Sequence, residues 1–109
     1  MKLYEFEGKE IFKEAGIQVP EGIPIIEEAQ VHLLTTLTTE FLKKHPGVVV
    51  KAQTLAGGRG KAGGIAFCST VAEVNAAAER FLDRPILNEK VTKLLIEEKI
   101  KIQEEYYLG

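Results

Sequence analysis

Cysteine is nearly absent from the sequence, which limits the covalent and catalytic roles open to the chain. Cys68 is the single cysteine among 109 residues, so no disulfide can form within the chain. A reducing compartment is therefore the simpler assumption. Since no histidine lies near Cys68 in the sequence to activate it, we expect a buried small side chain there rather than a catalytic thiol.

Long apolar runs and an excess of positive charge are also missing. No segment approaches the roughly 20 apolar residues of a membrane-spanning helix, and the acidic Glu5 interrupts the start where a signal peptide needs an apolar run. The net charge is -2 and the basic residues are spread along the chain, which argues against nucleic acid as a partner. We therefore expect a cytoplasmic protein, or a mitochondrial-matrix one in a eukaryote, that binds neither membrane nor nucleic acid.

The composition is that of one ordinary soluble domain. The chain is 45% apolar and 28% charged, which is enough for a modest core at this length. The chain contains both amphipathic helix patterns and several β-rich segments, which indicates an α+β fold with one layered core. We expect residues 1–109 to form a single domain with about three helices.

The first predicted helix runs from Tyr4 to Ala15. Tyr4, Ile11, Phe12 and Ala15 fall mostly on one helical face, which predicts that this face is apolar and packed. Gly16 follows, and glycine is the commonest residue just past a helix end. The helix is therefore expected to end at Gly16.

Two further helices are indicated by apolar spacing. A helix over 27–44 is predicted because large apolar side chains repeat every four residues from Leu33 to Phe41. Another should begin after Thr70, because Thr70 followed three residues later by Glu73 is a capping-box pattern.

Short β-rich segments complete the predicted fold. Val48–Val50 and Ile65–Cys68 are expected to form a hairpin-like pair, because both are rich in apolar residues and flank a glycine-rich segment. Lys93–Glu98 is predicted as another strand, and Glu104–Leu108 as the start of one more. Pro20, Gly22 and Pro24 make Gln18–Ile26 an extended connection or a short strand.

The glycine-rich segment is the most informative part of the chain. Five glycines lie between 57 and 64, where Arg59 and Lys61 add positive charge. Such a loop lets consecutive backbone N–H groups approach a phosphate chain, since glycine has no side chain to clash. It is neither the Walker pattern nor the dinucleotide motif. A flexible linker and a glycine-arginine RNA-binding segment are the alternatives, but both favour a polar, disordered context rather than two flanking strands.

Lys51 ends a strand that is otherwise apolar. We expect its ammonium to face a cleft that binds an anion, with phosphate as the obvious candidate. The alternative is a lysine on an edge strand that faces water.

Three stretches of the sequence resemble the beta subunit of succinyl-CoA synthetase. The run from Leu3 to Phe12, with Gly16 to Pro20, is similar to the family's opening. Lys51 to Gly64 matches its Lys-x-Gln-x-x-Ala-Gly-Gly-Arg-Gly-Lys-x-Gly-Gly signature, and Leu95 to Gly109 resembles its Ile-x-x-Glu-x-Tyr-Leu-Gly stretch. The resemblance implies the amino-terminal portion of an ATP-grasp fold with a mixed or antiparallel sheet. Residues 1–109 are then expected to be part of a longer subunit.

The resemblance also implies a function and a set of site residues. The family is an acid-CoA ligase that uses ATP or GTP with Mg²⁺, whose ligands are expected outside this chain. Its alpha subunit carries the CoA site and the phosphohistidine, so no catalytic residue is expected here, and the chain alone should be inactive. A malate-CoA or citrate-CoA ligase and a non-catalytic nucleotide-binding module remain alternatives. The nucleotide-binding residues implied are Lys51, Gly58, Arg59 and Gly60 at the phosphates, Glu97 and Ile100 beside the base, and Glu105 at the ribose.

Overall fold

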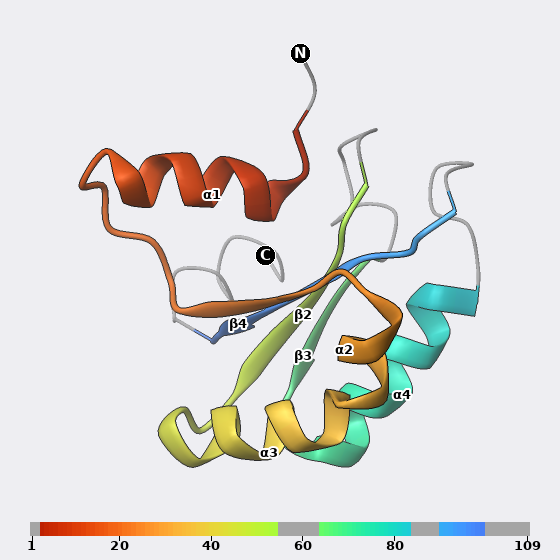
Figure 1. Cartoon of the computed structure of the whole chain (residues 1–109). Helices are drawn as coiled ribbons and strands as arrows, with labels where there is room; N and C mark the ends of the chain where they lie inside the picture. The colour runs from red at the N-terminus through yellow and green to blue at the C-terminus, as the bar shows by residue number, and fades with distance from the viewer. Residues whose placement is uncertain (1–2, 55–63, 84–89, 100–109) are drawn as a thin grey trace.

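A computed structural model describes residues 3–54, 64–83 and 90–99. These residues form both helices and an antiparallel sheet, and the predicted α+β class is confirmed (Figure 1). The elements are α1 Glu5–Glu14, β1 Gly22–Ile25, α2 Glu28–His32, α3 Leu34–Lys44, β2 Val48–Ala52, β3 Ile65–Cys68, α4 Val71–Asp83 and β4 Leu94–Glu98.

The four strands form one antiparallel sheet in the order β1-β4-β2-β3. The expected hairpin-like pairing of β2 with β3 is confirmed, with Val50 opposite Ala66. On its other side β2 pairs with β4, which places Val50 opposite Ile96. The strand predicted over Lys93–Glu98 is therefore present, whereas the segment Glu104–Leu108 lies outside the described residues.

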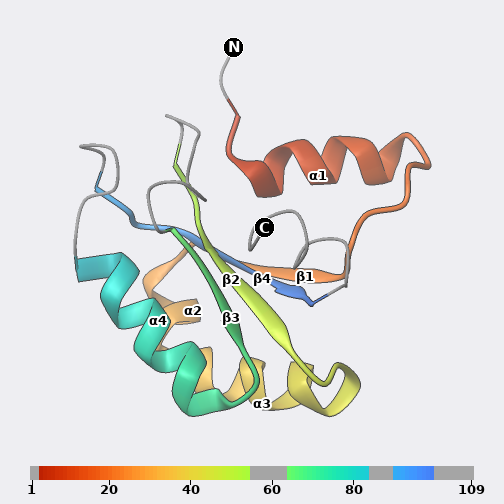
Figure 2. The same cartoon turned by 180° about the vertical axis from the view of Figure 1, so that it is seen from behind.

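The two faces of the sheet are covered differently. Figures 1 and 2 show α2, α3 and α4 on one face and, of the described helices, α1 over the other. Because side chains alternate along a strand, one face of β2 carries Val48, Val50 and Ala52 into the core. The opposite face carries Val49 and Lys51. The core therefore lies between the sheet and α3 with α4.

The helix predicted over 27–44 is two helices, which makes four described helices rather than about three. Leu33 ends α2 with φ -95° and ψ 7°, and its side chain is 53% exposed. The single helix expected from the four-residue repeat is therefore interrupted at Leu33, the first residue of that repeat. Along α3 the buried residues are Leu34, Thr38 and Phe41.

Helix α1 ends where the sequence predicted, but its apolar side chains are not buried. Gly16 has φ 84°, and the N–H groups of Gly16 and Ile17 donate to the carbonyls of Lys13 and Phe12 at 3.0 and 2.9 Å. This is the hydrogen-bond pattern of a glycine-terminated helix. The packed face expected for α1 was wrong, since Ile11 and Phe12 are each 51% exposed. Charged contacts hold α1 instead.

The capping box predicted before α4 is confirmed. The backbone N–H of Glu73 donates to Thr70 Oγ1 at 3.2 Å, and the N–H of Thr70 donates back to the Glu73 carboxylate at 3.2 Å. This exchange satisfies two N–H groups that a helix start otherwise leaves unpaired. The helix then buries Val74, Ala78 and Phe81 against the sheet.

Cys68 is a buried side chain at the end of β3, as expected. Burial raises the pKa of its thiol to about 11, with Glu73 adding to the rise and Arg80 opposing it. A thiol with so high a pKa carries almost no thiolate at neutral pH. Its role is to fill the core.

None of the described helices is long and apolar enough to cross a membrane.

Candidate functional site

Lys51 and Glu97 project from the face of the sheet that α1 covers. They lie on neighbouring strands, and the register sets Lys51 opposite Leu95 and Glu97 opposite Val49. The two are thus diagonal neighbours on one face, within reach of each other's side chains. Lys51 Nζ lies 2.7 Å from Glu97 Oε1.

Lys51 is an interior lysine. Its strand lies between β4 and β3, and the residue is only 2% exposed. The alternative of an edge-strand lysine that faces water is therefore wrong. A second carboxylate reaches it from α1, with Glu5 Oε2 2.8 Å from the ammonium. Burial of this charge is tolerated because two carboxylates surround it.

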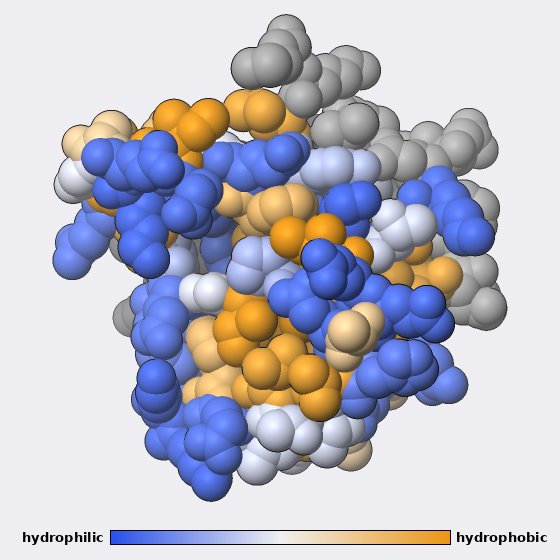
Figure 3. Space-filling model, viewed as in Figure 1, coloured by the Kyte–Doolittle hydropathy of each residue, from blue (hydrophilic) through white to orange (hydrophobic). Residues whose placement is uncertain are grey.

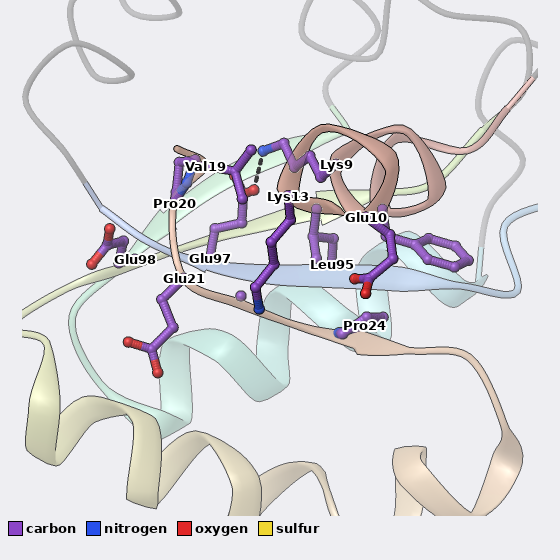
Figure 4. Close-up of a pocket in the computed structure, with 12 residues that line it drawn as sticks. Lys9, Glu10, Lys13, Val19, Pro20, Glu21, Pro24, Leu95, Glu97 and Glu98 are labelled. Carbon is purple, nitrogen blue, oxygen red and sulfur yellow. Dashed lines mark hydrogen bonds and ion pairs between the residues drawn. The ribbon is translucent and has the colours of Figure 1, made fainter. Parts of the chain in front are cut away.

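Lys9 completes a ring of alternating charges beneath α1. Its ammonium contacts Glu5 Oε2 at 3.0 Å, one helical turn away, and also contacts Glu97 Oε2 (Figure 4). We call Glu5, Lys9, Lys51 and Glu97 the charge quartet. Each carboxylate contacts both lysines, so two positive and two negative charges balance at a site where Glu97 has no exposed surface.

The pKa of Lys51 is raised above its ordinary value. Burial alone lowers it, because an apolar environment disfavours the charged form, but the attraction and hydrogen bonds of Glu5 and Glu97 outweigh burial. Lys51 therefore stays an ammonium at neutral pH. A permanent positive charge at this point is what an anionic ligand requires.

Gln53 joins the quartet to the backbone of α1. Its amide oxygen accepts from the backbone N–H of Phe6 at 3.0 Å, and its amide nitrogen donates to the backbone carbonyl of Lys51 at 3.3 Å. Gln53 is two residues beyond Lys51 and shares its face of the strand. Gln53, which is almost wholly buried just past the end of β2, thus helps Lys51 to fix the start of α1 to the sheet.

A cavity of about 360 Å³ lies beside the quartet, between α1 and the strands β1 and β4. Figure 4 shows Lys9 and Lys13 entering it from α1 and Glu97 closing it from β4. Its lining mixes charges of both signs. The residues around it are Phe6, Lys9, Glu10, Lys13, Val19, Pro20, Glu21, Gly22, Pro24, Leu95, Glu97 and Glu98.

Comparison with known proteins identifies the family of this chain. Residues 2–109 match the family of the ATP-grasp domain. The chain belongs to this family. The buried Lys51 and the glycine-rich segment that follows its strand therefore lie within an ATP-grasp domain.

Three curated relatives of this ATP-grasp chain are each the beta subunit of an ADP-forming succinate–CoA ligase. The protein from Methanocaldococcus jannaschii is 44% identical over 109 residues, and that from Staphylothermus marinus is 45% identical over 112. The Bacillus subtilis protein is 37% identical over 117 residues. Each alignment covers 100% of this chain but only 28%, 27% and 29% of the respective relative, so the chain spans somewhat more than a quarter of their length.

The structure brings together two of the residues that the resemblance implied, Lys51 and Glu97. Their roles toward a nucleotide stay predictions. Sequence reasoning missed the partners Glu5, Lys9 and Gln53. One signal was present, because Glu5 and Lys9 are four residues apart and so share a helix face. The remaining predicted site residues, which are Gly58, Arg59, Gly60, Ile100 and Glu105, lie outside the described residues.

A second polar cluster lies next to Glu97, where β1 begins and β4 ends. His45 Nε2 is 3.1 Å from Glu21 and His45 Nδ1 is 3.2 Å from Glu98, and the three groups have the residue types of a metal site. However, each ring nitrogen faces a different carboxylate, whereas one ion takes only one nitrogen of a ring. Lys44 also lies 3.9 Å from Glu21. The cluster is better suited to tying the end of α3 to the sheet.

Proposed function

We propose that residues 1–109 are the amino-terminal, nucleotide-binding part of an acid-CoA ligase of the succinyl-CoA synthetase type. The reaction of the whole enzyme is ATP (or GTP) with succinate and CoA, giving ADP (or GDP), phosphate and succinyl-CoA. The main support is identity of 37–45% over the entire chain with relatives that carry this name. An alpha subunit with the CoA site and the phosphohistidine would complete the enzyme, in the cytoplasm or the mitochondrial matrix.

Within that enzyme, Lys51 holds the nucleotide phosphates together with Gly58, Arg59 and Gly60. Its charged state and its position at the end of β2 support this role, because a buried ammonium attracts phosphate far more strongly than an exposed one. Glu97 is proposed to lie beside the base with Ile100, and Glu105 to contact the ribose. Phosphoryl transfer depends mainly on position and charge neutralisation, which these groups are suited to supply.

Magnesium does not fit the described carboxylates of this site. When bound, Mg²⁺ would neutralise part of the phosphate charge. Glu5 and Glu97 each contact two lysine ammonium groups, which repel a cation placed among them. We therefore propose that its ligands come from residues other than Glu5 and Glu97, in the longer subunit.

Substitution of Lys51 tests this function in the full ligase. Lys51→Ala should lower nucleotide affinity and rate together, with a loss of about 2 to 4 kcal/mol in transition-state stabilisation. Lys51→Arg keeps the charge and should retain part of the activity. Rates are compared per folded molecule, with the folded fraction measured by circular dichroism, because Lys51 is also buried.

Lys43→Ala is the matched control for this test. Lys43 pairs with Glu40 on the opposite side of the sheet, with both side chains 67% exposed, and its loss should leave the kinetics unchanged. Wild-type kinetics in Lys51→Ala would contradict the proposed phosphate contact. A panel of succinate, malate and citrate with CoA identifies the acid, and absence of acyl-CoA formation with all three would refute ligase activity of this type.

A further inference from the structure

We propose that Glu5 is a built-in competitor for the phosphate position on Lys51, and that α1 is a cover that the nucleotide displaces. The inference rests on the proposed function, in which Lys51 binds phosphate. Glu5 Oε2 lies 2.8 Å from the Lys51 ammonium, which is the distance of a charge-assisted hydrogen bond to a phosphate oxygen. A carboxylate on α1 thus makes the contact that the ligand is expected to make.

A phosphate and the Glu5 carboxylate would repel each other if both contacted the Lys51 ammonium. Lys51 already contacts two carboxylates, and a triphosphate would add several negative charges next to them. Repulsion between like charges at this separation is strong where water is excluded. One carboxylate must therefore leave before the phosphate binds closely.

Glu5 is the carboxylate that is able to leave. Glu97 belongs to β4, which is hydrogen bonded to β1 on one side and β2 on the other, and its side chain has no exposed surface. Glu5 belongs to α1, whose start reaches β2 and the residue after it through side-chain contacts alone: Phe6 N–H to Gln53 Oε1 at 3.0 Å, Gln53 Nε2 to Glu5 Oε1 at 3.5 Å, and the Lys51–Glu5 pair. Displacing Glu5 requires movement of one helix, whereas displacing Glu97 requires disruption of the sheet.

The attachment of α1 to the sheet is suited to such movement. No residue of α1 is buried, and the helix leaves a cavity of about 360 Å³ between itself and β1 with β4. Figure 3 shows apolar surface on the outer side of α1, the helix in which Ile11 and Phe12 are half-exposed. The hydrophobic effect therefore contributes little to holding α1 on the sheet, and charge contributes most.

The pairing within the quartet also lowers the cost of opening. Glu5 and Lys9 are one turn apart on the same helix and contact each other at 3.0 Å, so they leave the sheet as a neutral pair. Lys51 and Glu97 remain as a second neutral pair on the sheet. Movement of α1 away from the sheet therefore separates two neutral pairs, which costs less than separating two oppositely charged ions. The phosphate then binds the Lys51 ammonium where Glu5 had been.

The test measures binding of ATP with Mg²⁺ by calorimetry in the full-length subunit and in Glu5→Gln. Removing the competing charge should tighten binding about three- to tenfold, because a larger fraction of the protein is then in the open form. Glu14→Gln removes the same charge from an exposed position on the same helix and should leave affinity within about twofold of wild type. Unchanged or weaker binding in Glu5→Gln would overturn the proposal.

Hydrogen exchange of the wild-type subunit gives a second test that needs no variant. Amide exchange in 5–14 should become faster when ATP and Mg²⁺ bind, because α1 leaves the sheet. Unchanged or slower exchange there would show that α1 stays in place and would refute the cover. If Lys51→Ala leaves ATP affinity unchanged, the proposed function fails and the competition fails with it. If Lys51→Ala weakens binding while Glu5→Gln does not tighten it, only the competition fails.

Discussion

Replacing Lys51 by methionine should destabilise the 109-residue chain strongly. Methionine has a similar length and no charge, so the substitution removes the ammonium with little change in packing. The Lys51 side chain is 3% exposed, and the carboxylates of Glu97 and Glu5 that contact it are 0% and 11% exposed. Among the described residues, the variant would therefore leave Lys9 as the ammonium that contacts both carboxylates.

The magnitude follows from the burial of the unpaired charge. Removing one partner of a buried ion pair costs about 3 to 5 kcal/mol, because the other charge stays away from water. Lys9 still contacts both carboxylates, which places the expected loss near the lower end, at about 3 kcal/mol. That is a large part of the roughly 5 to 15 kcal/mol by which a domain of ordinary stability is folded.

Urea unfolding at pH 7, followed by circular dichroism, measures this loss by linear extrapolation. The double variant Lys51→Met with Glu97→Gln restores neutrality, and we expect it to be at least about 1 kcal/mol more stable than Lys51→Met. Lys43→Met breaks an exposed pair and should change stability by less than about 0.5 kcal/mol. A loss below about 1 kcal/mol in Lys51→Met would show that the quartet is open to solvent and refute this reasoning.

Two further predictions concern the core and the sheet. Because the pKa of the Cys68 thiol is raised to about 11, its contribution to stability is complete below about pH 9 and is lost as pH rises through about 11. The difference in unfolding free energy between wild type and Cys68→Ala should therefore fall over that range. A constant difference would contradict the burial of the thiol. Gly22→Ala should cost about 1 to 3 kcal/mol in urea unfolding, because the new Cβ would meet Glu97 Cγ and the Ile96 carbonyl oxygen at 3.1 Å. At Gly8, in the middle of α1, a new Cβ would have no atom within 4 Å, so Gly8→Ala should instead stabilise the chain by about 0.5 to 1 kcal/mol. Equal effects at the two glycines would refute the steric argument.

The sequence predicted the elements whose signals are local. The capping box of Thr70 and Glu73 and the stop at Gly16 depend on hydrogen bonds within a few residues, and both are present. The pairing of β2 with β3 was predictable because the two segments are close in sequence and similarly apolar. Local chemistry determines these features before any packing is considered.

Features that depend on packing were predicted less well. A repeat of four residues from Leu33 to Phe41 fits one continuous helix, and nothing in that spacing indicates the break at Leu33. Likewise, the apolar residues of α1 predict a packed face, whereas the contacts that hold this helix come from Glu5 and Lys9. Periodicity reports which side chains share a face, but it does not report which face meets the sheet.

Lys51 likewise has one feature that the local sequence predicted and one that depends on the fold. A lysine at the end of an apolar strand predicted an anion partner for Lys51, and the structure places the anions of Glu5 and Glu97 there. Glu5 lies 46 residues away in the sequence, so the pattern around Lys51 contains no trace of it. The sequence thus indicated that Lys51 has an anionic partner but not which residues provide it. If an ATP phosphate also binds Lys51, the affinity for ATP depends on the stability of α1 on the sheet as much as on the contacts between ATP and the protein. Glu5→Gln separates these two contributions.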